Sequence, residues 1–150
     1  MKKRWKKLDH EVPWWMPGNP TGEVFFLTVC CEPRGKNQLA NDEVWEVLAD
    51  SLEVRQKRGN WDCRLFLAMP DHVHLLAMFE GERRMERVVG QWKRWVATRA
   101  GVKWQRDFFE HRLRTNESAV EKVSYILDNP VRAGLVGRRE DWAFVWRPEG

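Results

Sequence analysis

Hydrophobic residues recur along the chain with two different periods, and the order of these patterns predicts the fold. Apolar runs bounded by turn residues predict strands at 24–31, 63–69, 72–79 and 108–114. Apolar positions spaced by three and four predict helices at 42–58, around 85–96 with Gly101 as the stop, and from Glu117 to about Asp128. This order is typical of an α+β, ferredoxin-like (RRM-like) antiparallel sheet with helices on one face. An additional C-terminal helix follows, and the other sheet face is expected to be open to a ligand.

Composition divides the chain into three segments. We expect a basic, tryptophan-rich N-terminal arm at 1–22, one folded domain at 23–136 and a C-terminal tail at 137–150. A chain of 150 residues is long enough to bury its own core. No apolar run reaches the roughly 20 residues of a membrane span, and the charged start leads into no signal-peptide core. These patterns predict a soluble, cytoplasmic protein with no membrane partner.

The cysteines are consistent with a reducing compartment. Cys30 and Cys31 are adjacent and Cys63 stands alone, so the chain has neither a C-x-x-C pair nor an even disulfide framework. All three lie in apolar, strand-like stretches. We interpret them as reduced core residues, with a structural zinc site as the alternative.

The formal net charge of +4 is concentrated at the N-terminus. Five basic residues against Asp9 give the first ten residues a net charge of +4, so the other 140 residues sum to zero. Such an arm suits a phosphate backbone or an acidic surface, and a solvated, disordered terminus is the alternative. The five residues are Lys2, Lys3, Arg4, Lys6 and Lys7.

Two histidines form a candidate metal site. His72 and His74 are two positions apart on a predicted strand, so both side chains project from one face, away from the packing helices. Val73 and Leu75 point the other way, into the expected core. Two imidazoles on one face can share a divalent metal and leave coordination positions for a substrate. The alternative is a pair of unrelated surface histidines.

Tyr125 is the only tyrosine beside ten tryptophans, most of which we expect in the core. At about 100° per residue, it falls nearly opposite the apolar stripe of Val120, Val123 and Leu127. A reactive hydroxyl there could face a cleft, although an ordinary exposed tyrosine would also fit. Asn129 lies one turn later on the same face, where a side-chain carbonyl could complete a metal's coordination. Because the next residue is proline, we expect the helix to end at about Asn129.

Two sequence blocks resemble a known family. Met69–Leu76 reads MPDHVHLL, and Tyr125–Val136 reads YILDNPVRAGLV. Both resemble the REP-associated tyrosine transposases, which belong to the HUH single-strand transposases of bacterial insertion sequences. The resemblance runs from about Val24 to Trp142. Asp71 departs from it, because the family more usually has asparagine at that position.

The resemblance implies a DNA-nicking and strand-joining enzyme that acts on single-stranded or hairpin DNA through a covalent 5′-phosphotyrosine. In it, Tyr125 matches the nucleophile, His72 and His74 match the metal-binding histidines, and Asn129 matches a third ligand. The mixed imidazole and amide ligands suit Mg²⁺ or Mn²⁺. A domesticated, non-cleaving hairpin-binding protein is the first alternative, and a replication-initiation nuclease is a more distant one.

DNA contacts are expected from the N-terminal arm and from the arginine-rich outer side of the second helix. Lys93 also matches a position where the family carries a basic residue. The helical residues expected to contact DNA are Arg87, Lys93 and Arg94.

Overall fold

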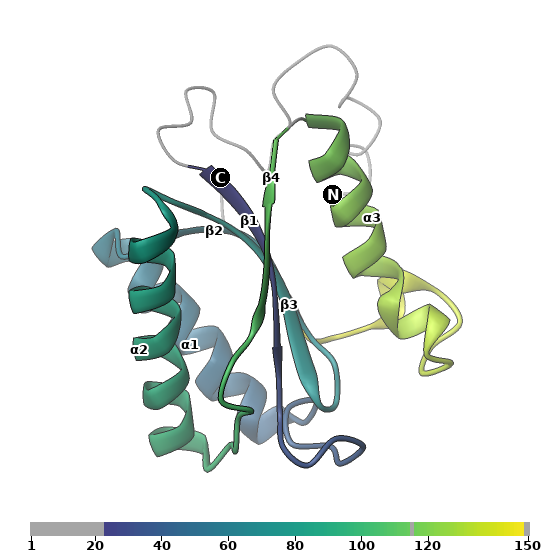
Figure 1. Ribbon diagram of the computed structural model, residues 1–150. Helices are drawn as coiled ribbons and strands as arrows, with labels where there is room; N and C mark the ends of the chain where they lie inside the picture. The colour runs from purple at the N-terminus through teal and green to yellow at the C-terminus, as the bar shows by residue number, and fades with distance from the viewer. Residues whose placement is uncertain (1–22, 115, 149–150) are drawn as a thin grey trace.

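The computed structural model describes residues 23–114 and 116–148. The predicted arm at 1–22, with its five basic residues, lies outside the described residues. The described part contains the elements labelled in Figure 1. They are β1 (Glu23–Cys30), α1 (Asp42–Arg58), β2 (Asp62–Ala68), β3 (His72–Phe79), α2 (Glu82–Ala100), β4 (Phe109–Leu113), α3 (Asn116–Arg132), the 3-10 turn η2 (Arg139–Asp141) and β5 (Val145–Trp146).

The strands form one antiparallel sheet in the order β4-β1-β3-β2-β5. The first four strands and two intervening helices follow the order predicted from the sequence, so the fold class is confirmed. Helices α1 and α2 cover one face of the sheet and α3 lies against the other (Figure 1). None of the helices in the described ranges is long and apolar enough to cross a membrane.

The larger core lies between the sheet and helices α1 and α2. It takes alternate residues of β3, including Val73 and Leu75, together with the apolar face of α2. That face lies within the predicted helix and has the predicted spacing of three and four residues: Met85, Val88, Val89, Trp92 and Val96. Helix α1 begins where Asn41 accepts a hydrogen bond from the Val44 N–H, and it ends at Gly59, whose φ of 73° favours glycine.

A smaller core lies between the other sheet face and α3, so this face is not open as expected. Val123, Ile126 and other apolar residues of α3 pack against Leu76 and Met78 of β3. The expectation of an open face was wrong because the third helix carries a continuous apolar stripe. When such a stripe covers the apolar side of the sheet, the burial stabilises the folded state by roughly 25 cal/mol per Å² of apolar surface.

Helix α3 does not end before Pro130, as the sequence suggested, but continues to Arg132. A proline inside a helix removes one N–H donor and disfavours helical geometry at the preceding residue. The helix is terminated by Gly134, which lies two residues after Arg132 and has a left-handed φ of 76°. The Leu135 N–H donates to the Pro130 carbonyl at 2.9 Å, as in a Schellman motif. The glycine four residues later, and not the proline, therefore determines the end.

Residues after 136, expected as a tail, pack against the domain as far as the described chain extends. Val145 and Trp146 add strand β5 to the edge of β2. The Trp142 indole N–H donates to the Ala68 carbonyl at 2.9 Å. A strand of two residues is too short to leave a periodic pattern in the sequence, which is why this element was not predicted.

One buried hydrogen-bond chain ties α1 to α2. The Ser51 hydroxyl is fully buried, donates to the Leu48 carbonyl at 2.6 Å and accepts from the Trp92 indole N–H at 2.9 Å. Trp92 is itself completely buried, so its N–H has no access to water. The hydroxyl therefore satisfies the polar atom of the largest side chain in the core.

Ser51→Ala is expected to lower the free energy of unfolding by about 1–3 kcal/mol, because it leaves the Trp92 N–H buried without an acceptor. Chemical denaturation followed by tryptophan fluorescence measures this change. Ser124→Ala in α3 is the control, where alanine is expected to be neutral or stabilising by about 0.5 kcal/mol. Equal effects of the two substitutions would contradict the role assigned to the hydrogen bond.

Candidate active site

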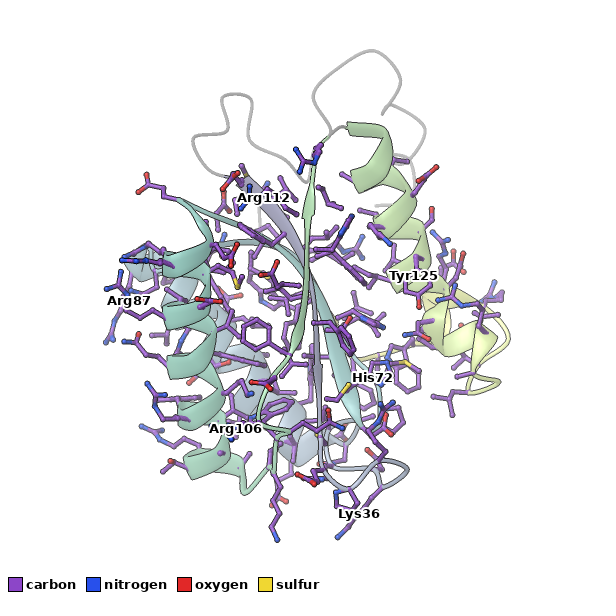
Figure 2. The ribbon with its side chains drawn as sticks, in the orientation of Figure 1. Lys36, His72, Arg87, Arg106, Arg112 and Tyr125 are labelled. Atoms are coloured by element: carbon purple, nitrogen blue, oxygen red, sulfur yellow. The ribbon has the colours of Figure 1, made fainter. Side chains whose placement is uncertain are left out.

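The residues singled out on β3 and α3 meet on the sheet face that α3 covers. The Asn129 Nδ2 lies 3.4 Å from the His72 Nε2, and the His72 and His74 rings have centroids 4.8 Å apart. The centroid of the Tyr125 ring lies 5.8 Å from that of His74. Figure 2 shows His72 and Tyr125 on the same side of the sheet. Four side chains from two distant sequence blocks therefore form one cluster.

His74 lies at the inner end of this cluster and is only 5% exposed. Its ring stacks on Phe26 with centroids 5.4 Å apart, and its Nδ1 is 2.9 Å from the Thr28 hydroxyl. Burial lowers the pKa of His74 to about 3, with further contributions from His72, Arg132 and Lys122. At neutral pH its imidazole is therefore uncharged, as a metal ligand must be.

Strand register explains the contact with Thr28. In the β1–β3 ladder, Thr28 lies opposite His74 and Cys30 lies opposite His72. Residues directly opposite in an antiparallel pair point to the same face, so the hydroxyl of β1 reaches the imidazole of β3. Sequence reasoning missed Thr28, although its alternation with Phe26 on the predicted strand already placed both on this face.

His72 has a carboxylate partner next to it in the chain. Its Nδ1 lies 2.9 Å from Asp71 Oδ1. The other oxygen, Oδ2, accepts from Arg34 Nε at 2.9 Å and from the Gly35 backbone N–H at 2.7 Å. Burial raises the pKa of Asp71, but the hydrogen bonds from Arg34, Gly35 and His72 outweigh it and hold that pKa well below its usual range. Asp71 is therefore an anion fixed by three donors.

The hydrogen bonds at Nδ1 of His72 and His74 leave the Nε2 nitrogen of each ring to coordinate a metal. When His72 donates from Nδ1 to Asp71, its Nε2 carries a lone pair and faces the Asn129 amide. When His74 donates from Nδ1 to Thr28, its Nε2 likewise carries the lone pair. Backing of this kind is usual for metal-bound histidines, because it fixes the tautomer and the ring orientation.

Tyr125 lies at the surface of the cluster and is 46% exposed. Its ring packs edge-on against Phe26 with centroids 6.1 Å apart. Lys122 Nζ is 5.6 Å and Arg132 Cζ is 4.2 Å from the centre of the Tyr125 ring. Sequence reasoning did not select these cations, although both lie within about 60° of Tyr125 on the helical wheel.

The basic residues predicted on α2 lie on the far side of the sheet from this cluster. Arg87 and Arg94 are exposed, and Figure 2 shows Arg87 on the outer side of α2, away from Tyr125. Lys93 instead turns back on its own domain, where its ammonium donates to the carbonyls of Gln105 and Arg106 at 2.8 and 3.0 Å. Contact of these three residues with DNA stays a prediction.

Comparison with known proteins identifies relatives by sequence and by fold, although no family model matches the chain. A REP-associated tyrosine transposase of Escherichia coli is 27% identical over 126 residues, which cover 82% of this chain and 75% of that protein. A Haemophilus influenzae protein proposed to be a REP-associated tyrosine transposase is 24% identical over 141 residues, covering 82% of this chain and 78% of that protein.

Solved structures share the fold. A REP-associated tyrosine transposase bound to a REP hairpin superposes with a TM-score of 0.73 at 24% identity, covering 83% of this chain and 76% of that one. A Deinococcus radiodurans protein proposed to be a transposase has a TM-score of 0.53 at 20% identity, covering 74% and 93%. Over 82% of its length, the chain is thus similar in sequence to a REP-associated tyrosine transposase, a member of the family that its two sequence blocks resemble.

Proposed function

We propose that this protein is a metal-dependent transposase that nicks and rejoins single-stranded, hairpin-forming DNA through a covalent 5′-phosphotyrosine on Tyr125. The observation that carries this proposal is the contact of Asn129 with His72, 57 positions away in the sequence. It brings the candidate metal ligands and the exposed Tyr125 into one cluster. A protein that only bound hairpins would need no such combination.

The donor set fits a divalent cation. His72 and His74 each have one ring nitrogen backed by a fixed partner, which leaves the other nitrogen to coordinate. Asn129 adds an amide whose oxygen is a hard ligand, suited to Mg²⁺ or Mn²⁺. When bound, such a cation would bind an oxygen of the scissile phosphate and offset its negative charge during the reaction.

Tyr125 supplies the nucleophile in this proposal. Its hydroxyl oxygen would attack phosphorus and displace the 3′ oxygen, which leaves as a hydroxyl. One phosphoester bond replaces another, so the bond energy is kept and a 3′-hydroxyl can reverse the step and join strands. The half-exposed ring fits this role, because a DNA strand must reach the hydroxyl from outside.

Hairpin DNA is the proposed partner because of the relatives. The fold is shared with a REP-associated tyrosine transposase that was solved bound to a REP hairpin. The exposed Arg87 and Arg94 supply positive charge on α2, where a folded DNA stem could lie while a single strand reaches the opposite face.

Tyr125→Phe is expected to abolish a DNA adduct that wild-type protein forms with hairpin DNA and Mn²⁺. The substitution removes only the attacking oxygen and keeps the ring contacts with Phe26 and His74. Denaturing gel electrophoresis of labelled DNA measures the adduct, and binding of the same hairpin by the variant serves as the control. An adduct that persists in the variant would exclude Tyr125 as nucleophile. Hairpin binding without an adduct in the wild type would favour the non-cleaving alternative.

His72→Ala and His74→Ala are expected to weaken Mn²⁺ binding strongly and to remove adduct formation, because each deletes a coordinating nitrogen. Electron paramagnetic resonance of free Mn²⁺ measures the affinity. His111→Ala is the matched control, since His111 is exposed on β4 and is not part of the cluster. If all three variants bind Mn²⁺ equally, the proposed ligand set is wrong.

Asp71→Asn is expected to weaken Mn²⁺ binding by about 10- to 100-fold, a typical cost of losing a partner that backs a metal ligand. The Asp71 carboxylate accepts from His72 with one oxygen and from Arg34 and Gly35 with the other. An asparagine amide has only one oxygen, so it can keep the hydrogen bond on one of these two sides but not on both. Hairpin affinity without metal should be unchanged. Unaltered Mn²⁺ affinity would show that Asp71 holds the turn and has no effect on the ligand.

A further inference from the structure

Two cations lie close to the Tyr125 ring. Lys122 Nζ is 5.6 Å from the centre of this ring and 4.9 Å from that of Phe26. Arg132 Cζ is 4.2 Å from the Tyr125 centre, and Arg132 also donates to the Tyr125 backbone carbonyl at 2.8 Å. The two residues are three positions before and seven positions after the tyrosine, so all three share one helix face.

Neither cation is neutralised by a carboxylate in the described part of the chain. Asp128, the acidic residue of α3 nearest in sequence to the tyrosine, is instead paired with Arg139 at 2.7 Å. The hydrogen bond from Arg132 to a backbone carbonyl uses one of five guanidinium N–H groups. The surface around the Tyr125 ring therefore carries positive charge, and the Arg132 guanidinium has further N–H donors besides the one that bonds the carbonyl.

The same positive charge reaches the candidate metal ligands. The His74 ring has its centroid 5.8 Å from that of the Tyr125 ring, which both cations contact. A divalent cation held there would add positive charge near the two cations, and the carboxylate next to the histidines, Asp71, already accepts from Arg34 and Gly35. Because like charges repel, an anion bound near Tyr125 would stabilise this arrangement.

We propose that Lys122 and Arg132 form the binding site for the phosphate group that Tyr125 attacks. This inference rests on the proposed function and names the protein groups that hold its substrate. In the step, a bond forms between the Tyr125 oxygen and phosphorus as the bond from phosphorus to the 3′ oxygen breaks. The tyrosine gives its proton to solvent and the 3′ oxygen takes one up, so protons and charge balance.

The two side chains differ in what they contribute to this site. Arg132 presents a planar fork that matches two phosphate oxygens, whereas Lys122 supplies a point charge on a flexible stem. After the step, the phosphate is bonded to the Tyr125 oxygen and remains near the two cations. They therefore stabilise the covalent intermediate as well as the charge that develops on the way to it.

Single-turnover adduct formation with saturating hairpin DNA and Mn²⁺ tests the role in the reaction. Lys122→Gln and Arg132→Gln should each slow the step on the order of 100-fold, the typical effect of removing one charge-stabilising donor. Arg132→Lys should recover part of the rate. Lys57→Gln is the matched control, since it removes one positive charge from exposed α1 on the opposite sheet face. Rates equal to that control would overturn the proposal while leaving the proposed function intact.

A binding measurement tests the site without any cleavage. Tyr125 is the sole tyrosine, so biosynthetic labelling with fluorotyrosine gives a single ¹⁹F resonance beside the two cations. Titration with inorganic phosphate should shift this resonance in the wild type and in Lys57→Gln, but not in the Lys122→Gln/Arg132→Gln double variant. No shift in the wild type, or an equal shift in the double variant, would overturn the proposal even if the protein forms no adduct.

Discussion

Packing of α3 across β3 is the interaction on which the site depends. The histidines belong to a strand held on both sides by other strands, whereas Tyr125 and Asn129 belong to a helix joined to the sheet by the smaller of two cores. Ala119, Val123 and Ile126 are almost completely buried in that core. Because a few apolar side chains fix the distance between Tyr125 and the two histidines, local opening of α3 would separate them without unfolding the rest.

The two histidines occupy different surroundings although they are two residues apart. His74 is buried between aromatic rings and is backed by a neutral hydroxyl, whereas His72 is nearer the surface and is backed by an anion that Arg34 holds in place. An anionic partner makes an imidazole a stronger electron donor than a hydroxyl does. The pair therefore combines one buried imidazole backed by a hydroxyl with one partly exposed imidazole backed by a carboxylate.

The periodicity of apolar residues predicted those features that belong to a single helix or strand. The bounds of β3 and the buried face of α2 agree with the sequence patterns, because burial on one side imposes a period of two or 3.6 residues. The end of α3 was missed because local rules weigh Pro130 above a glycine that lies beyond it. Alternation along the strand indicated the face of Thr28, but its contact with His74 depends on strand register, and the role of Asp71 depends on a loop 36 residues away. Neither the register nor the loop contact can be read from one sequence.

The sole tyrosine also limits what one molecule could do. His72, His74, Tyr125 and Asn129 all come from a single chain, so each copy of the proposed enzyme would hold a complete site and one covalent attachment point. Freeing a DNA segment requires breaks at both of its ends. Under the proposed chemistry, one copy would have to resolve its first DNA linkage before making a second, or two copies would have to act together. The number of protein copies needed to release one DNA segment would then follow from the single tyrosine in each chain.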